Sequence, residues 1–561
     1  MAQDFIQSLR AVASPKSVLT DAAKTRRFTK GYRYGAGTVL AVVQPRSLRV
    51  LWRVINLCVA ADKVMIMQAA NTGLTGGSTP DGQGYDRDVV IINTLLLDKI
   101  HLLGDGQQVV CQPGATLYGL EDMLRPLGRE PHSVIGSSCI GASVVGGVCN
   151  NSGGALIQRG PAYTELSLYA RVTEEGQVEL VNDLGIALGA EPEKILQRLE
   201  DGNFSASDVQ WPPAAASDHE YQSHVRAVDA ETPARFNADP RRLHAASGCA
   251  GKLAVFAVRM DTFQSAGPRR MFYIGTNDTA DLSNIRRDVL TQFETLPVSA
   301  EYMHSEAYDI AEKYGKDIFL AIYHLGTRFL PVIYSMKSRV DAFFEKIGHR
   351  GLSDRILQGV SKCFPAHLPS RMAAYRKRYA HYLMLDITAT DAEKMQNHLA
   401  GYFSARDTGA FFECTAQEAK KAHLHRFVAA GAGVRYRVIH ADVVDDILAL
   451  DIALRRNDTA WFETLPGDVA ADVVAKLYYG HFFCHVFHQD YLIRKGADVA
   501  SVKTRMLARL DARRAEYPAE HNVGHVYKAK DTLARFYQAL DPCNVFNPGI
   551  GQRTKKKDWQ V

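Results

Sequence analysis

The first part of the chain alternates short apolar runs with amphipathic segments. Residues 39–43 form an apolar run that a Gln-Pro pair closes, and similar β-branched runs follow at 64–67 and 89–92. Apolar runs bounded by turn-forming residues predict buried strands. Residues 47–61 show helical spacing behind a serine cap, and residues 4–12 predict a shorter amphipathic helix. Strands that alternate with a helix favour an α/β or α+β fold.

The pattern changes further along the chain. Residues 201–222 are polar, contain prolines and have no periodicity, which predicts an exposed loop. A strand is predicted at 271–274, and residues from about 385 return to mixed helices and strands. Between them, residues 321–384 are basic, with aromatic residues interleaved. The cations of this basic zone are Arg328, Lys337, Arg339, Lys346, Arg350, Arg355, Lys362, Arg371, Arg376, Lys377 and Arg378.

Length and composition limit the class of protein. A chain of 561 residues predicts roughly three or four domains of about 150 residues each. With 46% hydrophobic and 23% charged residues, the composition excludes a disordered, collagen-like or polytopic membrane protein. The net charge of +5 is too small to indicate nucleic-acid binding by the whole chain. The nine cysteines show no Cys-x-x-Cys spacing, and no secretory signal or membrane span is evident, so we expect a soluble or peripheral protein.

Two glycine-rich segments carry the strongest local signal, at 68–78 and at 136–154. Glycines let the backbone approach a ligand closely, so that amide N–H groups can bind phosphate oxygens. Neither segment matches a Walker A loop or the GxGxxG of nicotinamide-binding folds. Each could be a set of tight turns, but both together, dense in Ser, Thr and Asn, favour a nucleotide pyrophosphate site.

The same segments carry a resemblance to a flavoprotein superfamily. Pro45, Ser47 and Asn71-Thr-Gly-Leu-Thr-Gly-Gly77 resemble the flavin-binding signature of the vanillyl-alcohol-oxidase/para-cresol-methylhydroxylase superfamily. Residues 247–255 resemble the strand that closes its FAD domain. The whole chain is similar to the bacterial respiratory, quinone-dependent D-lactate dehydrogenases, most clearly at 129–141, 517–525 and 547–551.

The resemblance implies FAD bound without a covalent link, since no candidate His or Cys stands in the first loop. It also implies the flavin contacts. They are Ala69, Ala70, Asn71, Thr72, Gly73, Gly77, Ser78, Gly136, Ser143, Gly153 and Val255.

Oxidation of a 2-hydroxy acid needs a hydride acceptor, a base for the hydroxyl proton and a cation for the carboxylate. The resemblance implies FAD as acceptor, with His521 as base beside Glu520. His481 and His488, with Glu520, resemble the metal-binding set of related D-2-hydroxyacid dehydrogenases and would suit a divalent metal. The chain lacks the Asp-Gly turn that those relatives carry between the histidines, so packed, hydrogen-bonding histidines are the alternative.

Two arginines are candidates for the substrate carboxylate. A guanidinium binds a carboxylate through two parallel hydrogen bonds. Arg426 matches the family's substrate arginine best, and Arg435 is the second candidate. The alternative for each is a solvated residue on a helix face.

The basic zone also has two interpretations. A charge run is often a solvated face, but one-sided basicity with interleaved aromatic residues is typical of a surface that rests on anionic phospholipid. RNA binding is the weaker alternative, because no RNA-binding signature is present and no nucleic acid is expected. The resemblance implies a peripheral enzyme on the cytoplasmic face of the bacterial inner membrane that passes electrons to membrane quinone.

We therefore predict an α+β protein with a two-subdomain FAD-binding domain, a discontinuous cap domain and a basic membrane-binding insertion. The expected function is oxidation of D-lactate to pyruvate. The alternatives are a dehydrogenase of another D-2-hydroxy acid, such as 2-hydroxyglutarate or glycolate, and a non-catalytic membrane- or RNA-associated scaffold. The predicted boundaries are 1–261 for the FAD domain, 262–320 and 385–510 for the cap, 321–384 for the insertion, and 511–561 for a segment completing the FAD domain.

Overall fold

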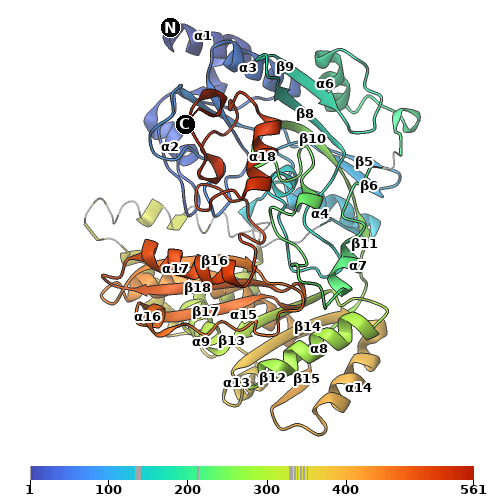
Figure 1. Ribbon diagram of the computed structural model, residues 1–561, viewed down its shortest axis with the longest axis vertical. Coiled ribbons are helices and arrows are strands. Elements are labelled where there is room, and N and C mark those ends of the chain that lie inside the picture. The colour runs from blue at the N-terminus through green and yellow to red at the C-terminus, as the bar shows by residue number, and fades with distance from the viewer. Residues whose placement is uncertain are drawn as a thin grey trace.

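The structure is a computed structural model with two lobes (Figure 1). One lobe contains the N-terminal half together with the C-terminal segment, and the other is built on one large sheet with helices on both faces. The structure describes residues 2–132, 140–211, 214–327, 333, 336–337, 339–341, 344, 346, 348–349 and 351–560.

The first lobe begins with a four-stranded sheet in the order β1-β2-β4-β3. Its strands are β1 (Val18–Leu19), β2 (Ala41–Val43), β3 (Val64–Gln68) and β4 (Val89–Asn93). The helices α1 (Ala2–Ala13) and α3 (Leu48–Ala60) share a core with this sheet. Ser47 caps α3, its hydroxyl accepting from the Val50 amide at 3.1 Å. The three predicted strands and both predicted helices are therefore confirmed.

A second, antiparallel sheet completes the lobe, in the order β5-β6-β10-β8-β9. Its strands are β5 (Ile100–Leu103), β6 (Gln108–Cys111), β8 (Ser167–Val172), β9 (Val178–Asn182) and β10 (Ala254–Asp261). The nearby helices are α4 (Leu117–Leu124), α5 (Val144–Cys149) and α6 (Pro192–Asp201). The predicted loop at 201–222 is mostly irregular, but Ser205 and Asp208 form a capping box around a short 3₁₀ turn at Ala206–Asp208, and α7 (Tyr221–Arg226) begins at its end.

The second lobe is a seven-stranded antiparallel sheet in the order β15-β12-β14-β13-β17-β18-β16. Its strands are β12 (Arg269–Thr276), β13 (Ser299–His304), β14 (His381–Thr388), β15 (Gly409–Glu413), β16 (Val444–Ala453), β17 (Val473–His481) and β18 (Val486–Arg494). The strand predicted at 271–274 is the centre of β12. Side chains alternate between two cores, as a pleated strand requires: Phe272 and Ile274 lie in one, Met271 and Tyr273 in the other.

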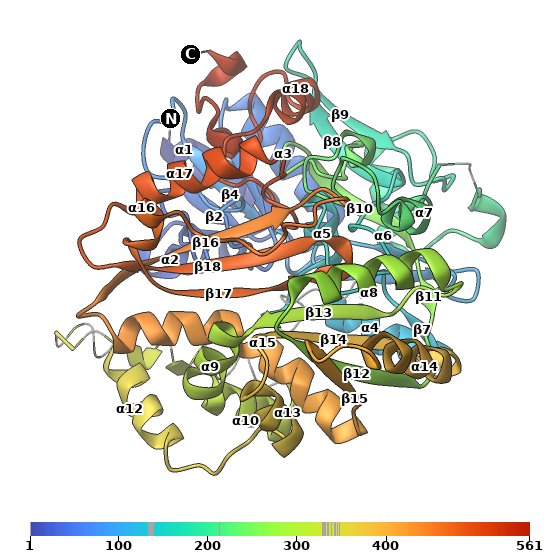
Figure 2. The ribbon, with the colours of Figure 1, turned by 60° about the horizontal axis from the view of Figure 1, so that its bottom comes forward.

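Each face of this sheet has its own helices. The first core includes residues of α8 (Thr279–Gln292), α14 (Ala392–Phe403) and α17 (Val499–Ala512). The second core includes residues of α9 (Ser305–Tyr314), α10 (Lys316–Leu325) and α15 (Ala416–Ile439). Beyond α10 lie α12 (Leu352–Ser361) and α13 (Ser370–Arg376), at the periphery of the molecule (Figure 2). None of the helices among the described residues is both long and apolar enough to cross a bilayer.

After α17 the chain returns to the first lobe, where α18 (Asp531–Leu540) lies beside strands of the N-terminal half (Figure 1). The Met65 amide donates to Val545 O at 2.9 Å, and the Asn547 amide donates to Met65 O at 2.8 Å. Lys252, fully buried, donates to Asn544 Oδ1 at 2.6 Å. These contacts support our proposal that residues 511–561 complete a domain begun by 1–261.

Candidate active site

One face of the seven-stranded sheet carries a row of acidic and imidazole side chains. Strand register pairs Asp451 with His488, His488 with Tyr479, and His481 with Glu301. Residues paired across antiparallel strands share a face, and so do residues two apart on one strand. The register therefore brings these side chains, from β16, β18, β17 and β13, onto a single face, which is also the face that α15 covers.

The turn between the two histidines contains no Asp-Gly pair and is aromatic instead. Residues 482–484 form a single 3₁₀ turn, and His485 takes a left-handed conformation with φ of 53°. His485 Nδ1 lies 2.8 Å from Arg455 O, so this side chain links the turn to the segment that follows β16. The aromatic sequence thus still closes a hairpin that presents His481 and His488 together.

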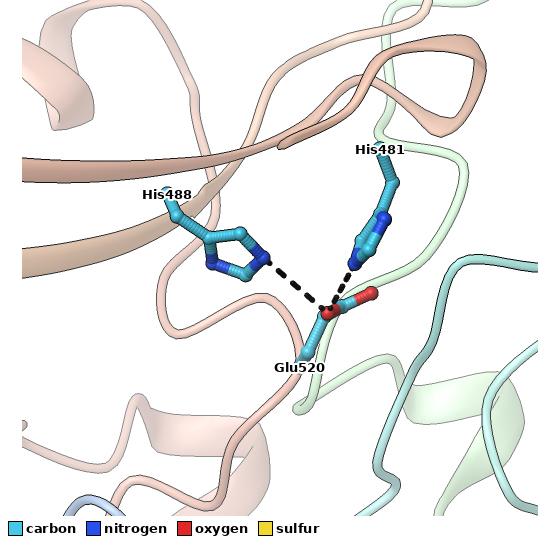
Figure 3. Close-up of side chains that lie close together, drawn as sticks. All are labelled: His481, His488 and Glu520. Atoms are coloured by element: carbon cyan, nitrogen blue, oxygen red, sulfur yellow. Dashed lines mark hydrogen bonds and ion pairs between the residues drawn. The ribbon is translucent and has the colours of Figure 1, made fainter. Parts of the chain in front are cut away.

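Glu520 is the point where this row meets the C-terminal segment. Its Oε2 lies 3.1 Å from His481 Nε2 and 3.9 Å from His488 Nε2, and Figure 3 shows both imidazoles directed at the same carboxylate. Its Oε1 accepts from Arg235 Nη2 at 2.5 Å. The ligand atoms of His481, His488 and Glu520 all lie within 4.8 Å of one another. The three residues predicted as a metal site are therefore brought together.

The opposite nitrogen of each imidazole contacts a second carboxylate. His481 Nδ1 lies 2.5 Å from Glu301 Oε1, and His488 Nδ1 lies 3.3 Å from Asp451 Oδ1. Histidines that ligate metals commonly have the other ring nitrogen bound to a carboxylate, which fixes the tautomer and the orientation of the ring. This arrangement fits a metal site better than it fits two packed histidines.

The electrostatics of the cluster favour a positive charge at its centre. Although burial alone would lower it, Glu301 and Glu520 raise the pKa of His481 to about 10. Burial alone would raise the pKa of Glu301, but His481 and Arg426 hold it at about 2. Burial alone would also raise the pKa of Glu520, but the nearby His481 and Arg235 lower it below its usual value. A metal ion bound here would displace any proton from His481 Nε2, since metal binding displaces protons from its ligands.

His521 follows Glu520 and lies at the edge of this cluster. Its Nε2 lies 3.8 Å from Asp451 Oδ2, and its side chain is 32% exposed. The same oxygen is held in place, because it accepts from the Glu520 amide at 2.7 Å. A fixed, buried carboxylate thus lies beside an accessible imidazole, where it would stabilise the protonated form of a general base.

Of the two predicted substrate arginines, the structure places only Arg426 at the site. Its Nε lies 3.0 Å from Glu301 Oε2, and its guanidinium stacks over the Tyr479 ring at 4.4 Å. Arg435 follows nine residues later on α15, about 13 Å along the helix axis. It is buried, and its guanidinium contacts Asp317 of α10 at 2.9 Å and Asp354 of α12 at 2.8 Å. The structure therefore does not bring Arg435 to the site: its charge lies between two carboxylates that link α15 to α10 and α12.

Both glycine-rich segments reach this cluster. A Cβ on Gly153 would lie 2.3 Å from Glu520 Oε1, and one on Gly77 would lie 2.5 Å from Asn522 Nδ2. Asn522 Nδ2 also donates to Asn150 Oδ1 at 2.8 Å, and Thr75 Oγ1 donates to Asn522 O at 2.8 Å. The segment 520–522 therefore lies between the two glycine loops and the histidines, so a ligand held by the loops would border the cluster.

The first loop retains free hydrogen-bond donors. Among the described residues, no acceptor is found for the amide N–H groups from Asn71 to Ser78. A Cβ on Gly73 would meet nothing within 4 Å, so the loop borders open space. Free amides beside open space fit a phosphate-bearing cofactor.

The remaining predicted flavin contacts have varied settings. Ala69, Ala70 and Thr72 are half-buried on the first loop, and the Ser78 hydroxyl donates to Asn71 Oδ1 at 2.9 Å. Ser143 is buried, and its hydroxyl accepts from the Gly146 amide to cap α5. Val255 is buried within β10. Gly136 lies outside the described residues.

Sequence reasoning missed Arg235, Glu301, Asp451 and Asn522. Each contacts a predicted site residue. Asn522 lies inside the motif at 517–525, next to His521, whereas Arg235, Glu301 and Asp451 stand apart from every recognised motif and reach the site only through the tertiary fold.

Comparison with known proteins gives the family. Residues 39–180 match the family described as "FAD binding domain", and residues 271–559 match "D-lactate dehydrogenase, membrane binding". The quinone-dependent D-lactate dehydrogenase of Escherichia coli (strain K12) is 56% identical, covering 99% of this chain and 98% of its own length. The chain belongs to the quinone-dependent D-lactate dehydrogenase family.

Another member of the quinone-dependent D-lactate dehydrogenase family, from Haemophilus influenzae, is 53% identical and covers 99% of both chains. The solved structure of p-cresol methylhydroxylase with substrate bound has a TM-score of 0.57 at 12% identity, covering 98% of this chain and 96% of its own. That likeness confirms the predicted superfamily fold. The family also confirms the resemblance drawn from the glycine segments and the C-terminal motifs.

Proposed function

We infer that this chain is a FAD-dependent, quinone-linked D-lactate dehydrogenase associated peripherally with a membrane. It oxidises D-lactate to pyruvate. The observation that carries the assignment to particular residues is the meeting of two glycine loops, an accessible imidazole beside a buried carboxylate, and an arginine around segment 520–522. FAD, when bound by the loops, supplies the acceptor for the hydride.

The protein's own residues supply the rest of the chemistry. We propose that Arg426 holds the substrate carboxylate, because the side chain lies at the cluster, ion-paired with Glu301, and a guanidinium carries further N–H groups that can bind a carboxylate. His521 takes the hydroxyl proton, and Asp451 stabilises the imidazolium that forms. Removal of that proton leaves the electron pair that expels hydride from Cα.

We further propose that His481, His488 and Glu520 hold one divalent metal ion. Two imidazoles and one carboxylate leave coordination positions open for substrate oxygen atoms. Such an ion would polarise the lactate hydroxyl beside His521. Glu301 and Asp451 would then act as the carboxylates that orient its two histidine ligands.

We propose that the membrane is anionic and is the cytoplasmic face of the bacterial inner membrane. In support, Arg339, Lys346, Arg355, Lys362 and Lys377 are all exposed in the basic zone. Other cations of the zone are already paired within the protein: Lys337 with Asp341 and Asp354, Arg371 with Glu418, and Arg376 with Asp309. Arg328 and Arg350 lie outside the described residues.

Neutralising the exposed cations tests the membrane proposal. Changing Arg339, Lys346, Arg355, Lys362 and Lys377 to Gln should weaken binding to anionic vesicles, since each cation contributes about 1 kcal/mol near such a surface. Sedimentation with vesicles of 3:1 phosphatidylcholine and phosphatidylglycerol measures the bound fraction of each variant. The loss of binding relative to wild type should be largest at low salt. The matched control changes Arg376 and Lys337, whose charges are paired, and should bind more nearly like wild type. Equal binding by all variants would contradict an electrostatic role.

Anaerobic visible spectra test the function itself. The FAD-loaded protein should lose its flavin absorption on addition of D-lactate and keep it with L-lactate. The same titration with D-2-hydroxyglutarate and glycolate identifies a different 2-hydroxy acid substrate, if there is one. Absorption that persists with D-lactate would overturn the proposed substrate, and a protein that takes up no FAD would overturn the flavin site.

A further inference from the structure

Helix α12 has its polar and apolar faces the wrong way round for a helix at a water-exposed surface. Its buried residues are Ser353, Gln358 and Ser361, which are 6%, 5% and 2% exposed. On the other side, Ile356 and Val360 are 50% and 49% exposed. A surface helix normally turns its apolar stripe toward the core and its polar face toward water. Here the stripe points outward.

The outward stripe continues beyond the helix. Ile356 and Val360, four residues apart, lie on one face of α12, and the exposed Cys363 follows in the turn after the helix. Phe364 is 44% exposed, and Leu325, at the end of α10, is 57% exposed. Adjacent apolar side chains left in water indicate an interaction surface.

Ion pairs hold α12 in this orientation. Asp354 lies on the face opposite Ile356 and contacts Arg435 of α15 at 2.8 Å and Lys337 at 3.0 Å. Gln358, on the same inner face, donates to Lys313 O of α9 at 2.9 Å. Rotation of α12 to bury its apolar stripe would break the contacts of Asp354 with Arg435 and Lys337, and would leave the buried Arg435 guanidinium with Asp317 alone. The structure thus fixes an exposed apolar stripe.

The charges beside the stripe indicate its partner. Arg355 and Lys362 are exposed and lie along one flank of the stripe, seven residues apart. An apolar stripe with basic residues beside it is typical of a helix that lies in the interface of an anionic bilayer. We propose that α12 inserts the side chains of Ile356, Val360 and Phe364 below the headgroups of such a bilayer. This inference rests on the proposed membrane attachment and adds an apolar, salt-resistant contribution to it.

The test compares two pairs of aliphatic residues whose side chains are exposed to a similar extent. Ile356→Ser with Val360→Ser removes the stripe, and Leu96→Ser with Leu102→Ser removes two side chains, 42% and 40% exposed, on the other lobe. Binding to vesicles of 3:1 phosphatidylcholine and phosphatidylglycerol is measured at 0.1 M and 0.5 M NaCl. We expect the α12 pair to weaken binding about tenfold or more at both salt concentrations, in proportion to the apolar area lost, and the control pair to have no effect. Both proteins should still reduce their flavin with D-lactate.

A native cysteine reports insertion directly. Cys363 is the exposed cysteine among those that the structure describes, so an environment-sensitive thiol dye can be placed there, with Cys363→Ser as the labelling control. Its emission should rise and shift to the blue on vesicles. Wild-type protein that fails to bind vesicles at either salt concentration would overturn the membrane attachment itself. Wild-type binding that the α12 pair leaves unchanged, or a dye that stays in water, would overturn the role of α12 alone. Sedimentation velocity that shows the α12 pair dissociating an oligomer, with vesicle binding intact, would assign the stripe to a second copy.

Discussion

Replacing His521 by alanine should slow the reduction of bound flavin by D-lactate at least about 100-fold, because general-base catalysis commonly contributes 10²–10⁴-fold. FAD should remain bound, since the glycine loops do not use this side chain. Anaerobic stopped-flow spectroscopy of the flavin absorption measures the rate of the single reduction step. Added imidazole should restore part of the rate, because it can enter beside Asp451 where the ring was lost.

Two other variants separate a base from a binding residue. His219→Ala removes an imidazole that is 65% exposed on the first lobe, and it should leave the rate of flavin reduction unchanged. Arg426→Lys keeps the charge but loses the planar fork, so it should raise the KM for D-lactate more than it lowers the maximal rate. Wild-type reduction rates in His521→Ala would refute the assignment of the base.

Replacing Glu520 by glutamine should cost about 3–5 kcal/mol of folding free energy, because it leaves the buried Arg235 guanidinium without its carboxylate. The same change should lower the content of bound divalent metal at least about tenfold, since a metal ligand contributes more than the residues behind it, which are worth about 10–100-fold. Urea unfolding measures the first effect, and elemental analysis of purified protein measures the second.

A paired replacement distinguishes the two effects. Arg235→Met together with Glu520→Met removes both charges, and well-packed apolar residues often replace a buried ion pair at little cost. The double variant should therefore recover most of the lost stability while remaining without metal. A single variant as stable as wild type would mean that Gly154 O, which also accepts from Arg235 Nη2, is enough to satisfy the buried guanidinium. Equal metal content in wild type and Glu520→Gln would exclude Glu520 as a ligand.

The sequence predicts elements well where the pattern is local. The apolar runs at 64–67 and 89–92 became β3 and β4 because β-branched residues between turn signals have few other stable arrangements. Ser47 was predicted to cap a helix and does, since the cap needs only its own amide neighbours. The glycine loops were recognisable for the same reason, whereas the pair His481 and His488 was recognisable only from its resemblance to a motif of related dehydrogenases.

What the sequence could not show depends on distant segments. Glu301 reads as one polar residue in a short strand, and only pairing of β13 with β17 brings it to His481. In the sequence, Arg435 is a second arginine with the same chemistry as Arg426. In the structure, α15 carries it away from the site, toward Asp317 and Asp354. The inverted faces of α12 were also invisible, because a stripe of apolar residues every fourth position predicts burial when no neighbours are known.

The junction of the first glycine loop with segment 520–525 has a consequence for synthesis. Thr75 and Asn522, which share a hydrogen bond, are 447 residues apart in the chain. At ribosomal rates of about 5–20 residues per second, the first loop waits roughly 20–90 s for the segment that completes its cradle. During that time the N-terminal sheets leave the ribosome without Phe546 and its neighbours, which later fill their core. The nascent enzyme should therefore need chaperone protection for much of its translation, and it should acquire flavin only at the end.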